Sequence, residues 1–161
     1  MINTKVTLAG VELKNPVMTA SGTFGFGAEY SEFVDLNKLG GVVTKGVANV
    51  PWPGNPTPRV TETASGMLNA IGLQNPGIDL FCKRDIPFLK QYDTKIIVNV
   101  CGKSTEDYCE VVERLTGATA VSVGTANFFN PYATVEIAEG IEKFMAQQKV
   151  EDINQLIGIV K

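Results

Sequence analysis

The sequence contains no histidine. Without an imidazole, histidine-dependent catalytic triads and most transition-metal sites are excluded. The three cysteines, Cys82, Cys101 and Cys109, are odd in number and lack CxxC spacing. The pattern therefore predicts neither a disulfide framework nor a zinc site, and we expect no metal centre.

Long apolar runs and an excess of basic residues are also missing. No run approaches the ~20 residues that a membrane-spanning helix needs, and the opening residues, MINTKVTLAG, have no apolar core typical of a signal peptide. The net charge of −3 argues against a nucleic-acid partner. Because 44% of the 161 residues are hydrophobic, the chain can form a core. We expect a cytoplasmic globular protein without a membrane or nucleic-acid partner.

Strand and helix patterns alternate along the chain. KVTLAGVELKNPV predicts a hairpin that turns at Ala9-Gly10. Short apolar runs typical of buried strands occur in PVMTASG, GVVTKG, KIIVNVCG and ATAVSVGT. Helices are predicted at YSEFVDLNKLG, IDLFCKRDIPFLKQY, STEDYCEVVERL (with Ser104 or Thr105 as its N-cap), 133–147 and 150–160. Residues 49–66 form a long excursion with a hairpin around RVTE. This alternation is typical of a parallel α/β sheet with crossover helices.

Small and polar residues follow the predicted strands, at the edge where ligands bind in such sheets. They are Ser21, Lys45, Gly46, Asn99, Gly124 and Thr125. Small residues leave room, a cation and an amide offer polar contacts, and a turn before a helix can bind phosphate. The set favours a flat, phosphorylated cofactor, although GxGxxG and P-loop motifs are absent. Alternatives stay open: tight packing for the serine and glycines, a solvent-directed lysine, a buried amide and a helix-cap turn.

Five ordered motifs give the chain a family resemblance. They are NPVMTASGTFGFGAEY, GGVVTKGV, GNPTPRVTETASGMLNAIGLQNPG, IIVNV and AVSVGTANFFNPY. Together they resemble dihydroorotate dehydrogenase, the FMN enzyme of pyrimidine synthesis, and SGTFGFGAEY is similar to its NAD-linked class. The resemblance implies a (β/α)8 TIM barrel, oxidation of dihydroorotate to orotate, and a homodimer. It also implies that NAD is the final acceptor, reached through an iron–sulfur FAD subunit.

The resemblance is interrupted near residues 113–121. Residues 1–115 resemble the first three β/α units, and residues 117–161 resemble the last unit and the C-terminal helices of a barrel about twice as long. The missing middle carries the family's catalytic-base loop, a second lysine and most of its phosphate site. We expect one incomplete barrel domain of about four parallel strands, with strand 119–123 beside 17–20 as in barrel closure. No catalytic residue is retained.

The loop GMLNAIGLQNPG, residues 66–77, has the chemistry to hold a planar anion. Gly72 permits a tight turn, so N–H groups around Ile71, Gly72 and Leu73 can point at one carboxylate. Asn69 can donate and accept at a ring edge. A purely structural turn is the alternative.

The resemblance implies specific contacts. Orotate would be held by Lys45, Asn69, Ala70, Ile71, Gly72 and Leu73. FMN would be held by Ser21, Lys45, Gly46, Asn99, Gly124 and Thr125. Cys101 is not expected to act as the base, because it lies outside the family's base-loop context and nothing in the nearby sequence lowers its pKa.

Two hypotheses follow for this chain. One is an incomplete catalytic subunit whose function belongs to the whole protein. The other is an internally deleted product without oxidoreductase activity that keeps some anion or flavin binding, or an interaction surface.

Overall fold

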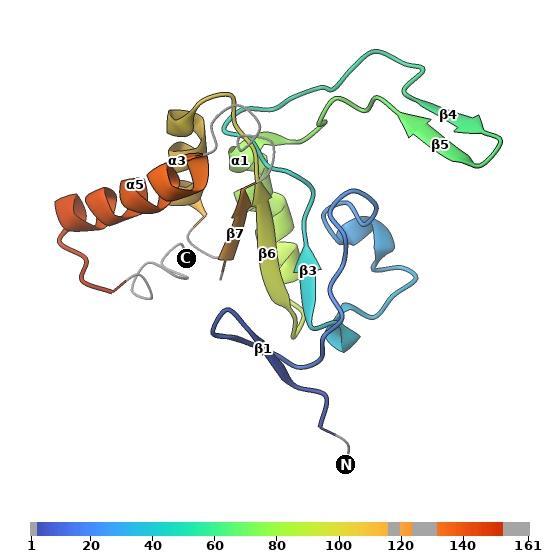
Figure 1. The fold of residues 1–161 in the computed structure, drawn as a ribbon. Coiled ribbons are helices and arrows are strands. Elements are labelled where there is room, and N and C mark those ends of the chain that lie inside the picture. The colour runs from blue at the N-terminus through green and yellow to red at the C-terminus, as the bar shows by residue number, and fades with distance from the viewer. Residues whose placement is uncertain (1–2, 116–119, 124–131, 153–161) are drawn as a thin grey trace.

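An antiparallel hairpin opens the computed structural model, which describes residues 3–115, 120–123 and 132–152. Strands β1 (Val6–Leu8) and β2 (Val11–Leu13) pair with Leu8 opposite Val11. The predicted turn is confirmed, since Ala9 and Gly10 both have positive φ, at 48° and 84°. In Figure 1 the hairpin lies below the main sheet.

The main sheet is parallel and has the order β3-β6-β7. Its strands are β3 (Gly41–Val43), β6 (Lys95–Val100) and β7 (Ala120–Val123). A single parallel bridge between Met18 and Gly41 adds the segment 17–20 on the far side of β3. The run PVMTASG therefore contributes one bridge where a strand was predicted. Four chain segments, in the order in which they occur in the sequence, make the incomplete barrel (Figure 1).

The predicted place of the last strand is wrong. β7 pairs with β6, Asn99 lying opposite Ser122, and not with residues 17–20. Barrel closure was the ground for the prediction, but closure needs all the intervening strands. Once these are missing, the N–H and C=O groups along the open edge of β6 are paired by the next strand in the chain, as neighbouring elements usually pair.

Helices cover one face of this sheet. A continuous helical segment comprises α1 (Gly77–Leu80), a π-helical turn (Phe81–Asp85) and α2 (Ile86–Leu89). Helix α3 (Thr105–Arg114) begins at Ser104, whose hydroxyl accepts from the backbone N–H of Asp107 at 3.2 Å, so that Ser104 is the N-cap. α5 (Ala133–Gln148) confirms the helix predicted at 133–147, whereas most of 150–160 lies outside the described residues.

The helix predicted over residues 30–40 is wrong. The chain forms two short 3-10 turns instead, η1 (Ala28–Tyr30) and η2 (Leu36–Lys38). Between them Asp35 has an extended backbone, with ψ of 104°, and its side chain accepts from the backbone N–H of Asn37. This local bond starts a new turn at the point where a continuous helix would have to pass.

The hairpin predicted around RVTE is confirmed. It consists of β4 (Val60–Thr63) and β5 (Gly66–Asn69), and every residue of both strands is exposed. Figure 1 shows it extending away from the sheet at the upper right. None of the helices among the described residues is long and apolar enough to cross a membrane.

The core lies between β6 and the helices. Ile96, Val98 and Val100 are buried in one cluster with Phe81 of the π-helical turn and Val111 of α3. On the opposite face of β6, Ile97 and Asn99 are half-buried and Lys95 is exposed. The helix-covered face therefore provides the core, and the opposite face is the inner side of the incomplete barrel.

Removing the Phe81 ring tests this assignment of the core. Phe81 is fully buried and its ring centroid lies 5.7 Å from that of Phe26. Phe81→Ala is expected to lower the free energy of unfolding by ~3–5 kcal/mol, because it leaves a cavity. Phe33→Ala is the matched control: Phe33 is 81% exposed, and a loss under ~1 kcal/mol is expected. Urea unfolding measures both, and equal losses would contradict the core described here.

Candidate functional site

Three residues predicted to contact a flavin lie together at the carboxyl ends of the parallel segments. Asn99, near the end of β6, donates from Nδ2 to Oγ of Ser21 at 3.5 Å. A Cβ added to Gly46 would lie 3.8 Å from the same Nδ2. Ser21, Gly46 and Asn99 thus form one cluster, on the half-buried face of β6.

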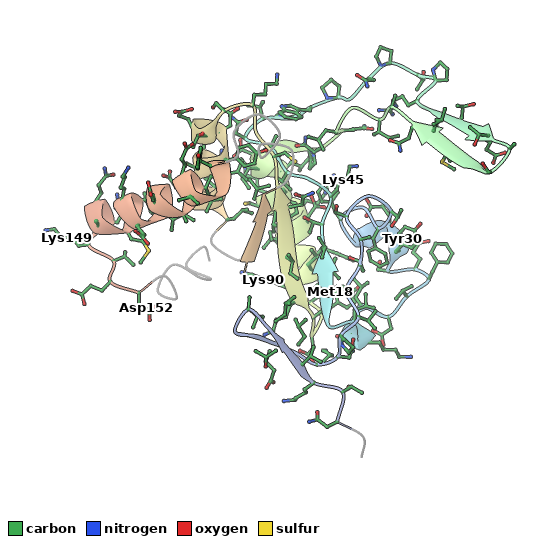
Figure 2. All side chains as sticks on the ribbon, in the orientation of Figure 1. Met18, Tyr30, Lys45, Lys90, Lys149 and Asp152 are labelled. Carbon is green, nitrogen blue, oxygen red and sulfur yellow. The ribbon has the colours of Figure 1, made fainter. Side chains whose placement is uncertain are left out.

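Lys45 belongs to the same edge of the sheet. It follows β3, it is half-buried, and its backbone N–H donates to the carbonyl of Gly25 at 2.8 Å. Figure 2 shows Lys45 beyond the end of β3. Its ammonium group is near enough to act on the Cys101 thiol, which it stabilises in the charged form. The Asn99 amide and the Ser21 hydroxyl are therefore in contact at this edge, and the Lys45 ammonium group acts on the neighbouring Cys101.

Cys101 is protonated at neutral pH. Burial raises the pKa of its thiol to about 11, although Lys45 acts in the opposite direction. The expectation that nothing nearby would lower this pKa was wrong about Lys45, but the desolvation of a thiol that is 5% exposed outweighs the charge. A thiol in this state cannot accept a proton.

Gly46 lets the predicted substrate loop approach the strand ends. A Cβ at this position would lie 2.3 Å from Cys101 Sγ and 3.3 Å from Cδ1 of Leu73. Real Cβ atoms are essentially never this close to a sulfur, so only glycine fits without displacement. The Leu73 side chain therefore packs directly against the backbone of Gly46, next to the cluster.

The other predicted substrate-loop residues divide into two groups. Asn69 pairs with Val60 in the β4–β5 hairpin, and the backbone N–H of Ala70 donates to Arg59 O at 2.8 Å. The carbonyl of Ile71 accepts from Asn55 N at 3.0 Å. These three residues are tied to residues 55–60 of the excursion. Asn69 is the last residue of β5, and the β4–β5 hairpin extends away from the main sheet (Figure 1).

Gly72 and Leu73 turn the chain back toward the sheet. Both residues have left-handed backbone conformations, with φ of 75° for Gly72 and 54° for Leu73. A Cβ on Gly72 would lie 2.7 Å from Asn55 N, so this position needs glycine for both its space and its φ. The structure therefore brings Leu73 to Gly46, and it leaves Asn69 in the β4–β5 hairpin. Gly124 and Thr125 lie outside the described residues.

Sequence reasoning missed one organising residue, Asn75. It is 5% exposed and its side chain makes three hydrogen bonds to backbone groups. The available signal was that Asn75 is one of three amides in a largely apolar loop, since a buried amide must find partners. Among the described residues, no group of three Cys, Asp or Glu side chains could hold a metal ion.

Comparison with known proteins identifies relatives of this site. Residues 3–116 match the family model of dihydroorotate dehydrogenase. The catalytic subunit of dihydroorotate dehydrogenase B (NAD(+)) from Lachnoclostridium phytofermentans is 38% identical over 300 residues, covering 99% of this chain and 100% of that protein. The same subunit from Alkaliphilus metalliredigens is 56% identical over 156 residues, covering 96% of this chain and 51% of that protein.

The chain spans about half the length of the curated relatives that it matches. The Lachnoclostridium alignment runs through the whole relative, so nearly half of its positions have no residue of this chain opposite them. The family-model match ends at residue 116, within the segment 113–121 where the sequence predicts a join. The division of the chain into 1–115 and 117–161 stays a prediction.

Solved structures show the fold. A crystal structure of DHODH from Eimeria tenella in complex with ferulenol is 18% identical with a TM-score of 0.67, covering 89% of this chain and 45% of that one. The three-stranded parallel sheet and the bridged segment are part of a (β/α)8 barrel, as the sequence predicts.

The contact between Gly46 and Cys101 is testable by a double substitution. Gly46→Ala is expected to destabilise the chain by ~1–3 kcal/mol, because its Cβ would overlap the sulfur. Cys101→Ala removes that sulfur, so Gly46→Ala should lose markedly less stability in the Cys101→Ala background. A double-mutant cycle by chemical denaturation measures the coupling. Strict additivity of the two changes would show that Gly46 and Cys101 do not touch.

Proposed function

Because the chain belongs to the dihydroorotate dehydrogenase family, we propose that it carries the flavin- and orotate-facing half of a catalytic subunit. The whole subunit oxidises dihydroorotate to orotate in pyrimidine biosynthesis. One observation supports this assignment above the others: the Asn99 amide contacts the Ser21 hydroxyl at the carboxyl ends of parallel segments, the edge at which Lys45 follows β3. This is the edge where (β/α)8 barrels bind their substrates.

The chemistry of these donors fits an FMN ring. The Asn99 amide and the Ser21 hydroxyl offer donors and acceptors to the polar edge of a flavin, and each is left with bonding capacity beyond their mutual 3.5 Å contact. Gly46 leaves backbone without a side chain beside them. We propose that Ser21, Lys45, Gly46 and Asn99 hold the ring, and that Gly124 and Thr125 contact the phosphate. The redox chemistry is supplied by the bound flavin.

Lys45 and the Gly72–Leu73 turn are proposed to hold the substrate carboxylate. A half-buried ammonium group at a strand end stabilises an anion more strongly than one in water. Among the described residues, none accepts a hydrogen bond from the N–H groups of Gly72 or Leu73. Successive N–H groups at a left-handed turn are suited to an anion. Asn69 and the residues up to Ile71 complete the proposed substrate contacts after movement of the hairpin.

Proton removal from dihydroorotate is the step that this chain lacks. Cys101 is a thiol on which the charge of Lys45 acts, and with a pKa of about 11 it stays protonated. Loss of a general base typically slows a reaction by ~10²–10⁴-fold. We propose that the base belongs to the part of the family domain with no counterpart here.

A second candidate function is ligand binding without catalysis. The direct pairing of β6 with β7 favours it, because that pairing occupies the edge where further barrel strands would attach. An internally deleted chain could form this sheet by itself and keep the binding residues. For the whole subunit we propose a cytoplasmic homodimer that passes electrons to NAD through an iron–sulfur FAD subunit. The relatives' description as NAD(+) catalytic subunits supports the NAD acceptor and the existence of a partner subunit.

Orotate binding tests the proposed substrate contacts. With FMN in excess, Lys45→Ala is expected to weaken orotate binding by ~10–100-fold, the value of a charge-assisted contact. Lys90→Ala is the matched control, because Lys90 is exposed and lies at the opposite end of the sheet (Figure 2). Isothermal titration calorimetry measures both affinities. Equal affinities for the two variants would contradict the role of Lys45.

A turnover experiment tests the missing base. The chain, reconstituted with excess FMN, is expected to show no measurable bleaching of flavin absorbance when dihydroorotate is added without oxygen. The reason is that the binding groups are present and the proton acceptor is not. Stoichiometric bleaching that disappears in Lys45→Ala would overturn this expectation. It would assign the base to a residue of this chain, with Cys101 the first to substitute.

A further inference from the structure

The loop between the β4–β5 hairpin and α1 is fixed by one buried side chain. Asn75 is 5% exposed, and its Oδ1 accepts from the backbone N–H groups of Ala48 at 3.1 Å and Gly77 at 3.0 Å. Its Nδ2 donates to the carbonyl of Leu73 at 2.9 Å. The two backbone donors and the one carbonyl acceptor require this orientation of the amide.

These bonds connect three parts of the strand-end edge. Ala48 follows β3 by a few residues, Gly77 begins α1, and Leu73 packs on Gly46. The backbone of Asn75 adds a reciprocal pair with Trp52, at 3.0 and 3.1 Å. The chain that leaves the fold after Ala48 therefore returns to it at Asn75, and the pairing of Asn75 with Trp52 joins the outgoing and returning segments.

Leu73 has a conformation that needs support. Its φ of 54° lies in the left-handed region, which is unfavourable for a residue with a Cβ. The Asn75 amide binds the Leu73 carbonyl, and Gly46 makes room for the Leu73 side chain. Together these contacts stabilise the left-handed conformation of Leu73, which a loop without them would not keep.

We propose that Asn75 is a positioning residue of the orotate site. By its bond to the Leu73 carbonyl it holds the Gly72–Leu73 turn against Gly46, the residue that follows Lys45 in the chain. It does not touch the substrate itself. The inference rests on the proposed function, because that function supplies the anion which the turn binds.

Replacement of the Asn75 amide by a carboxylate distinguishes the positioning of Leu73 from a structural role at Ala48 and Gly77. Asn75→Asp keeps an acceptor for Ala48 and Gly77, as a helix-capping residue would. The ionised carboxylate cannot donate to Leu73. A merely structural role would be preserved by aspartate, whereas the positioning of Leu73 would be lost. Gln74→Glu is the matched control, since it makes the same chemical change at the adjacent, exposed position.

The experiment uses the 161-residue chain with two readouts. Backbone amide NMR signals of Gly72 and Leu73 are expected to shift in Asn75→Asp, while the amides of Ala48 and Gly77 stay protected from hydrogen exchange. Orotate affinity, measured with excess FMN, is expected to fall about tenfold, the value of one lost hydrogen bond. Gln74→Glu should change neither.

Unshifted Gly72 and Leu73 signals in Asn75→Asp would overturn the proposal. If the unaltered chain binds no orotate, the proposed function fails, and the amide signals alone then decide the role of Asn75. Asn75→Ser is the second variant in case a buried charge prevents folding. Its hydroxyl still accepts an N–H bond but is too short to reach the Leu73 carbonyl, so the same shifts are expected.

Discussion

The register between β3 and β6 is the constraint on which the site depends. Val43 lies opposite Ile97, and the pairing continues beyond β3, where Val47 N donates to Asn99 O and Cys101 N donates to Val47 O, both at 2.8 Å. Gly46 is thereby placed between Asn99 and Cys101. A slip of one residue would exchange the two faces of the strand and move Asn99 into the core.

Local patterns were sufficient to predict most elements, and non-local pairing was not. The hairpin at Ala9-Gly10, the β4–β5 hairpin and the Ser104 cap each depend on a few adjacent residues, and each was predicted correctly. The position of β7 depends on which strand edges remain unpaired in the folded sheet. The residues of β7 and its neighbours in the sequence do not carry that information. The helix predicted at 30–40 failed for a different reason, because the Asp35 side chain competes with helical bonding.

The site shows the same division between chemistry and placement. Residue type and strand-end position were enough to bring Ser21, Gly46 and Asn99 together, because parallel strands end at one edge. They were not enough for Asn69, whose position follows from the hairpin that carries it. The amide of Asn75 was visible in the sequence, but its role was overlooked because its partners are backbone groups, which no residue type identifies.

The proposed binding residues and the missing base belong to different parts of the family domain. Lys45, Asn99 and the Gly72–Leu73 turn lie within residues 45–99, and the nearby Cys101 thiol is held protonated by its burial. The charge of Lys45 lowers the pKa of the Cys101 thiol. In a solvent-exposed thiol, such a neighbouring cation favours the thiolate. In Cys101 the effect of desolvation on the pKa is larger than the effect of Lys45. Gly46 contributes to this burial, because the absence of a side chain there lets Cys101 and Leu73 both pack against its backbone. The packing around Gly46, one of the proposed binding residues, thus also keeps the Cys101 thiol protonated, and a protonated thiol cannot act as a general base.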